Sequence, residues 1–215
     1  MIDIIKLKQF VRHKILHKYS EHKEDKFVLE YFKNKRNGFY VDVGCYDPEL
    51  LSNTALLYKN GWHGINIDPI REKIDVFDRV RKRDTNLCLA IGNEETISFF
   101  VGTRSHDAND ACSSESEEWI KKLKVPYEKR TVQKQTLVSI FDKHLYKDID
   151  FLDVDTEGFD LQVLKTNNWE KYRPRLILVE TNYDRKNTIK HYLKSIGYRQ
   201  IYRNESNSFF EDVKK

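Results

Sequence analysis

Two apolar segments, each carrying an acidic residue at or near its end, constrain the fold of this chain more than any other feature. Gly38–Val43 contains Asp42 and runs into Gly44, while Gly64–Asp68 ends on Asp68. Short apolar runs separated by a helix and followed by glycine are typical of buried parallel strands. We therefore expect a strand–helix–strand unit of a nucleotide-binding α/β fold, whose strand ends form a pocket for an adenosine-containing cofactor.

The hydrophobic pattern predicts that strands and helices alternate along the rest of the chain. Strands are expected at 39–43, 64–68, 87–91, 97–101, 131–135, 150–154, 175–180, 198–202 and 208–213. Helices are expected at 27–32, 53–60, 71–81, 137–145, 161–164 and 189–195. This alternation predicts an α/β fold with a mostly parallel sheet, helices on both faces and an antiparallel C-terminal hairpin.

Length and composition suit one folded domain with a short appendage. With 215 residues and 13% aromatic residues, the chain can bury a sizeable core. We expect the domain to cover 24–215. Within it, 102–130 is polar and rich in Ser, Asp and Glu, which predicts an insertion that covers the site as a lid. No apolar run is long enough to span a membrane or to form a signal core, so we expect a soluble, cytoplasmic protein.

The first residues are unusually basic. Residues 1–37 hold ten Lys or Arg against five acidic residues, and apolar residues recur at helical spacing within 1–23. A basic amphipathic helix could contact anionic lipid or an acidic polymer, and contact with lipid would place the protein peripherally at the inner membrane. It could instead pack its apolar stripe on the domain and leave its lysines in water. The sequence leaves both interpretations open.

The first turn disfavours NAD as the cofactor. A dinucleotide fingerprint needs three glycines, and this turn has Gly44 alone. Asp47 and Pro48 stand where bare backbone N–H groups would have to meet a pyrophosphate. A carboxylate at that place would repel the phosphates.

A cationic sulfonium has the opposite requirement. S-adenosylmethionine carries no phosphate, and a rim of Asp42, Asp47, Asp153 and Asp155 would favour its positive charge. Asp68 follows the second strand, where an acid can accept hydrogen bonds from both ribose hydroxyls. Gly44 would let the cofactor approach the backbone without a Cβ in the way.

Several blocks resemble the signature of FkbM-type methyltransferases. The most specific is Asp155-Thr156-Glu157-Gly158, which follows a hydrophobic strand and precedes an acidic residue and an amphipathic helix. Four other blocks fit the family in the right order: 38–48, Ser52-Asn53-Thr54, 61–68 and 172–180. The resemblance covers roughly residues 24–213. Tyr46-Asp47 departs from the family pattern, and the basic N-terminus has no counterpart in it.

The resemblance implies a Rossmann-like methyltransferase fold with a mostly parallel seven-stranded sheet, and S-adenosylmethionine as cofactor. It also implies O-methylation, and the Ser-Asn-Thr variant looks like those associated with bacterial surface polysaccharides. The candidate cofactor-binding residues are Asp42, Gly44, Cys45, Tyr46, Asn53, Thr54, Asp68, Ala90, Ile91 and Asp153.

Three residues are candidates for catalysis. A sugar hydroxyl is a weak nucleophile and benefits from a base or a metal ion. Asp155 and Glu157 follow a strand end, and either could act as the base, while Asp155 could also ligate Mg²⁺. Glu157 could instead cap the helix that opens at Gly158. His106, in the predicted lid, is the third candidate, although a lone His among acids is often just solvated.

The expected function is methylation of a hydroxyl of a sugar, a nucleotide-sugar or a glycan. Two alternatives stay open: a nucleic-acid methyltransferase, supported by the basic N-terminus alone, and a non-catalytic module of a glycan-assembly complex. A formal charge of +4 is too small to argue for nucleic acid. The presence of the strand-end acids argues against a non-catalytic module.

Overall fold

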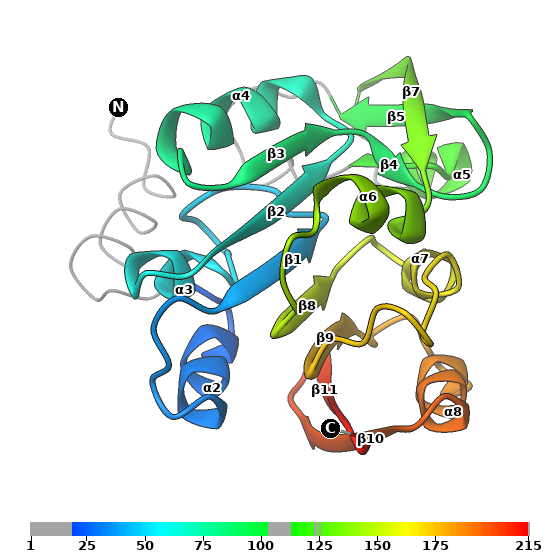
Figure 1. Ribbon diagram of the computed structural model, residues 1–215. Helices are drawn as coiled ribbons and strands as arrows, with labels where there is room; N and C mark the ends of the chain where they lie inside the picture. The colour runs from blue at the N-terminus through cyan, green and yellow to red at the C-terminus, as the bar shows by residue number, and fades with distance from the viewer. Residues whose placement is uncertain (1–18, 103–112, 123, 125, 215) are drawn as a thin grey trace.

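The computed structural model describes residues 19–102, 113–122, 124 and 126–214. Its main sheet has seven strands in the order β10-β11-β9-β8-β1-β2-β3, and within it β11 alone runs opposite to the other six (Figure 1). The strands are β1 (Phe39–Val43), β2 (His63–Asp68), β3 (Thr85–Cys88), β8 (Phe151–Val154), β9 (Leu176–Glu180), β10 (Tyr198–Arg203) and β11 (Asn207–Asp212). The expected mostly parallel sheet with a C-terminal antiparallel hairpin is confirmed.

Helices cover both faces of this sheet because successive strand residues point to opposite sides. Phe39, Val41 and Val43 pack with helices α6 (Leu137–His144), α7 (Asp160–Leu164) and α8 (Thr188–Ser195). Tyr40, between them, packs on the opposite face with α2 (Glu24–Tyr31) and α3 (Ala55–Lys59). Helix α4 (Arg71–Val80) packs on that second face too, since Arg81 at its end donates to the Tyr40 hydroxyl at 2.7 Å. The inner strands β1, β8 and β9 therefore have buried residues on both sides of the sheet.

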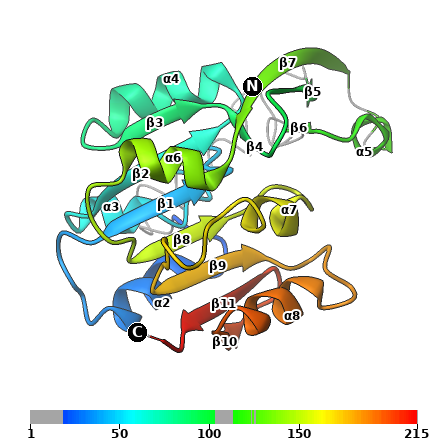
Figure 2. The ribbon, with the colours of Figure 1, turned by 45° about the vertical axis from the view of Figure 1, so that its right-hand side comes forward.

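A second sheet of four strands, in the order β4-β7-β5-β6, was not predicted. It contains β4 (Ala90–Ile91), β5 (Thr96–Gly102), β6 (Ser113–Ser114) and β7 (Tyr127–Gln135), with helix α5 (Glu117–Lys122) beside it. The expected strand 87–91 is divided, because the chain leaves the main sheet after Cys88 and pairs again at Ala90 with β7. Figures 1 and 2 show the small sheet beyond the carboxyl ends of β2 and β3.

The small sheet takes in part of the predicted lid. Pairing of β5 with β7 runs from Thr96 opposite Gln133 to Gly102 opposite Tyr127, so residues 127–130 belong to a strand. The strand expected at 131–135 therefore begins earlier, at Tyr127. The covering role of 102–130 stays a prediction.

The N-terminal segment is described from Tyr19. Residues 19–23, the end of the predicted basic helix, are not helical, and Lys23 has a left-handed φ of 70° immediately before α2. Residues 1–18 lie outside the described residues, and contact of this segment with lipid stays a prediction. Within the described part of the chain, no helix combines the length and apolar character needed to cross a membrane.

Candidate active site

A cavity of about 280 Å³ opens at the carboxyl ends of the main-sheet strands, between that sheet and the small one. The structure brings most of the predicted site residues together there. Those that line the cavity are Asp42, Gly44, Cys45, Tyr46, Asn53, Asp68, Ala90, Ile91, Asp153, Asp155 and Glu157. Thr54 does not line it, and His106 lies outside the described residues.

The Ser52-Asn53-Thr54 segment holds the two acids at the centre of the cavity. Thr54 donates from Oγ1 to Asp42 at 2.6 Å, and Asn53 donates from Nδ2 to Asp153 at 2.9 Å. Ser52 Oγ accepts the backbone N–H of residue 55, the first residue of α3, at 3.1 Å. Thr54, predicted as a cofactor ligand, is therefore a positioning residue that acts through Asp42.

Asp42 and Asp153 face the cavity side by side. They are register partners on the parallel strands β1 and β8, and each is almost fully buried. Burial is the main cause that raises the pKa of Asp42 to about 6. Burial, and then the charge of Asp42, raises the pKa of Asp153 well above its usual range. Asp153 Oδ1 is buried and accepts no hydrogen bond, so it is an acceptor that a bound donor could satisfy.

Gly44 is required for the fold itself, independently of any ligand. Its φ is +83°, and a Cβ there would stand 1.8 Å from the backbone carbonyl oxygen of Asp155. Glycine therefore lets the ends of β1 and β8 approach each other. We expected the missing Cβ to make room for a cofactor, but the atom nearest to its place belongs to Asp155.

Replacing Gly44 by alanine should destabilise the fold strongly. A left-handed alanine alone costs about 1–2 kcal/mol, and the clash with a backbone oxygen should add an overpacking cost of about 1–3 kcal/mol. Gly61→Ala is the matched control, because Gly61 also has a positive φ of 93° but its nearest neighbour would be 3.7 Å away. Urea unfolding of both variants measures the difference. Equal losses of stability would contradict the role of the Asp155 carbonyl.

Asp68 organises the turn after β2 as well as facing the cavity. Its carboxylate accepts the backbone N–H of Ile70 at 2.8 Å and of Tyr46 at 3.2 Å, and Lys73 Nζ lies 3.7 Å away. Burial is the largest influence on its pKa, which is raised although Lys73 opposes that shift. Asp47 has a different role from the one expected. It accepts the backbone N–H groups of residues 49 and 50 and closes a turn, and it is not part of the cavity lining.

Three further carboxylates cluster where β8 and β9 end. Asp155 follows β8, Glu157 lies two residues later, and Glu180 ends β9. Burial, reinforced by neighbouring acids, raises the pKa of Asp155 to about 8 and that of Glu180 to about 9. Glu180 Oε2 is buried and accepts no hydrogen bond. Carboxyl groups with pKa values near neutrality are suited to proton transfer.

Glu157 sits in a strained turn and does not cap a helix. Its φ is +54°, and Gly158 after it has a φ of +93°. Its carboxylate accepts a hydrogen bond from the Tyr183 hydroxyl at 3.3 Å, while the turn before α7 is held by Asp160, which accepts the backbone N–H of Thr156 at 2.9 Å. A left-handed backbone costs a non-glycine residue about 1–3 kcal/mol and is frequent at functional sites. The structure therefore favours the cavity role of Glu157 over helix capping.

The arrangement of these carboxylates does not support a Mg²⁺ site at Asp155. Among the described residues, no three His, Cys, Asp or Glu side chains are grouped as ligands for one ion. Asp155 therefore has no partner ligands there for Mg²⁺, which needs near-ideal octahedral oxygen coordination.

Sequence reasoning missed several lining residues. Glu180 carries the same signal that identified Asp42 and Asp153, an acid at the end of a buried apolar run, and could have been found. Lys73 on α4 and Phe99 on β5 carry no local signal. Their places depend on how α4 and the small sheet pack, as do those of Glu21, Glu115, Asn182, Ser206 and Asn207.

The residues present fit S-adenosylmethionine. Ile67, Pro69, Ala90 and Phe99 offer an apolar wall for an adenine ring, and the buried Asp68 stands at the end of β2. The unpartnered oxygen of Asp153 offers an acceptor to a cationic donor. The lining contains one lysine and eight acidic residues among those described, which suits a cation better than a pyrophosphate.

Solved structures of methyltransferases share this fold. A methyltransferase from Geobacter sulfurreducens aligns with a TM-score of 0.51 at 10% identity, covering 99% of this chain and 91% of its own. A TehB-like S-adenosylmethionine-dependent methyltransferase from Corynebacterium glutamicum aligns with a TM-score of 0.50 at 8% identity, covering 96% of each chain.

An FkbM methyltransferase from Methylobacillus flagellatus is a further structural match. It aligns at 17% identity with a TM-score of 0.49 over 81% of this chain, and this chain spans 43% of its length. A search of curated proteins finds no match.

A match to a family model identifies the family of this chain. The model of the methyltransferase FkbM domain matches residues 42–200, from Asp42 on β1 to β10. The match includes the cavity's strand ends and the Asp155–Gly158 turn, and it covers well over half of the chain. The chain therefore belongs to the FkbM family of S-adenosylmethionine-dependent methyltransferases.

Proposed function

We propose that this protein methylates a hydroxyl group of a sugar or a glycan. The observation that carries the proposal is Asp155, half-buried in the lining of the cavity with a pKa raised to about 8. A carboxylate of that basicity can take a proton from a hydroxyl near neutral pH, which an ordinary aspartate does poorly.

Methyl transfer to a hydroxyl requires the protein to bind the cofactor and to take a proton from the acceptor. S-adenosylmethionine, when bound, supplies an electrophilic methyl group. Asp42 and Asp68 would hold the cofactor, and Asp155 would take the proton that the acceptor hydroxyl gives up as its oxygen gains the methyl carbon. Much of the remaining catalysis can come from alignment of the two reactants, since the methyl transfer is an in-line displacement.

The rim of the cavity supports a carbohydrate acceptor. Asn182, Ser206 and Asn207 line it with side chains that can hydrogen bond to hydroxyl groups. Tyr183, whose hydroxyl donates to the lining residue Glu157 at 3.3 Å, is 53% exposed and offers an aromatic face to a sugar ring. Polysaccharide assembly in the cytoplasm, at the inner face of the membrane, is the setting that we propose.

Calorimetry with S-adenosylmethionine and S-adenosylhomocysteine, followed by mass spectrometry of host glycans incubated with cofactor, tests this function. We expect both ligands to bind and the glycan to gain one methyl group at oxygen. Absence of cofactor binding would contradict the whole proposal. Binding without transfer to any glycan would favour a non-catalytic module, and transfer to RNA or DNA would favour the nucleic-acid alternative.

A further inference from the structure

The cavity is lined by far more carboxyl groups than the cofactor can pair with. Eight acidic side chains line it, opposed by Lys73 as the single lysine or arginine among the described lining residues: Glu21, Asp42, Asp68, Glu115, Asp153, Asp155, Glu157 and Glu180. S-adenosylmethionine brings a sulfonium, an ammonium and a carboxylate, and so a single net positive charge. Glu115 pairs with Lys134 at 3.0 Å and Asp68 lies 3.7 Å from Lys73. Asp153, Asp155 and Glu180 form no ion pair with a lysine or arginine among the described residues.

The acids divide into two groups along the sheet. Asp42 and Asp68 stand at the ends of β1 and β2, whereas Asp155 and Glu180 stand at the ends of β8 and β9. Asp153 pairs in register with Leu178, and continuing that register by two residues places Asp155 opposite Glu180. The charge of Asp155 is, after burial, the largest influence that raises the pKa of Glu180. The second group therefore forms one continuous acidic wall.

Two buried oxygens in this wall lack a donor. Asp153 is only 3% exposed and lines the cavity, yet its Oδ1 accepts no hydrogen bond, and neither does Glu180 Oε2. Leaving a buried acceptor unpaired costs about 1–3 kcal/mol, more for a charged group. Both oxygens therefore point to a ligand that brings several donors and positive charge.

We propose that the acceptor is an amino sugar, or a glycan containing one, whose protonated amino group binds between Asp153, Asp155 and Glu180. This deepens the proposed function and rests on it. An ammonium has three donors and no acceptor, which matches a wall made of acceptors. A neutral hydroxyl has a single donor and two lone pairs that the carboxylates cannot satisfy.

The same cation would activate the base. Burial and mutual repulsion favour the protonated forms of Asp155 and Glu180, and a protonated carboxyl cannot take a proton from a hydroxyl. A nearby positive charge favours the ionised forms instead. Binding of the correct acceptor thus prepares Asp155 to act, while an acceptor bearing phosphate, such as a nucleotide-linked sugar or a nucleic acid, would be repelled.

Calorimetry on the protein saturated with S-adenosylhomocysteine tests the inference. The probes are glucosamine, galactosamine and mannosamine, each compared with its N-acetylated form below the pKa of the amine. At least one amino sugar should bind about tenfold or more tighter than its N-acetylated form, the effect of one charged hydrogen bond. If no amino sugar binds tighter than its acetylated form, the inference is overturned.

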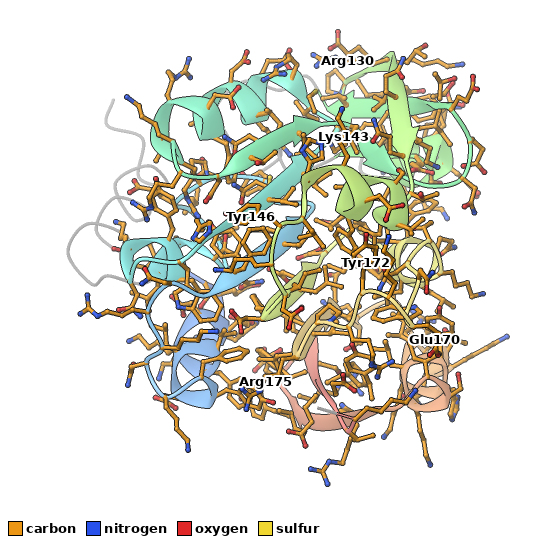
Figure 3. The ribbon with its side chains drawn as sticks, in the orientation of Figure 1. Arg130, Lys143, Tyr146, Glu170, Tyr172 and Arg175 are labelled. Carbon is orange, nitrogen blue, oxygen red and sulfur yellow. The ribbon has the colours of Figure 1, made fainter. Side chains whose placement is uncertain are left out.

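Glu180→Gln keeps the shape of the side chain and removes its charge, so it should reduce the preference for the free amine while affinity for S-adenosylhomocysteine is kept. Glu170→Gln, at an exposed position outside the cavity lining (Figure 3), should leave the preference unchanged. A preference that survives in Glu180→Gln would contradict the assignment of this site. Failure of S-adenosylhomocysteine to bind the unmodified protein would instead overturn the proposed function itself.

Discussion

Replacing Asp68 by alanine is expected to abolish measurable binding of S-adenosylmethionine. The carboxylate of Asp68 is buried in the cavity lining at the end of β2, where it can accept both ribose hydroxyls. Hydrogen bonds to a charged group contribute about 1.5–3 kcal/mol each. Losing two of them lowers affinity by about 10²–10⁴-fold. Calorimetry with S-adenosylhomocysteine measures the loss without any acceptor.

The controls for this variant must distinguish the loss of a cofactor contact from a loss of folding. Asp68 also accepts the backbone N–H groups of Tyr46 and Ile70, so its removal could destabilise the protein. Asp75→Ala removes an exposed acid from the next helix, where it pairs with Arg71 at 2.8 Å. Exposed ion pairs contribute little, so that variant should bind the cofactor normally. A melting temperature near that of the unmodified protein would show that Asp68→Ala is folded. Unchanged affinity in a folded Asp68→Ala would contradict the cofactor assignment.

Replacing Asp155 by asparagine is expected to lower kcat by about 10²–10⁴-fold, the usual contribution of a positioned general base. Asparagine keeps the size of the side chain but cannot accept a proton. The affinity for S-adenosylhomocysteine should change little, because Asp42 and Asp68 remain. Mass spectrometry of the methylated product measures the rate once an acceptor has been identified.

The pH profile distinguishes a base from a structural role for Asp155. Burial raises its pKa from 3.8 to about 8, so the active, ionised form gains population as pH rises through that range. Activity of the unmodified protein should rise with pH to a half-maximum well above the ordinary value of 3.8. The residual activity of Asp155→Asn should lose this rise. An unchanged profile in the variant would rule out Asp155 as the base.

Much of the fold could be predicted because its signals are local. Phe39–Val43 is a strand at the predicted bounds, and each helix predicted within 24–215 begins within a few residues of its expected start. Helix α5, which lies in the expected lid, was not predicted. Apolar runs and glycine stops report burial and chain reversal within a single segment. The small sheet was missed because its main pairing joins β5 to β7, across residues whose sequence is polar.

The site was predicted in part for the same reason. Acids that end buried runs, such as Asp42 and Asp155, converge because the carboxyl ends of parallel strands meet at one edge. Thr54 was expected at the cavity as part of the Ser-Asn-Thr block, and Asp47 as part of an acidic rim. The structure instead turns Thr54 onto Asp42 and uses Asp47 to close a turn.

The sequence by itself determined the alternation of strands and helices, the strand-end acids and the family signature, since each depends on residues close together in the chain. Tertiary structure decided which atoms those residues meet. It placed the Asp155 carbonyl where Gly44 would carry a Cβ, and it set Glu180 in line with the acids of β8. These contacts join segments more than a hundred residues apart or on separate strands, where burial, strand register and repulsion between charges act together, and no local pattern encodes that combination.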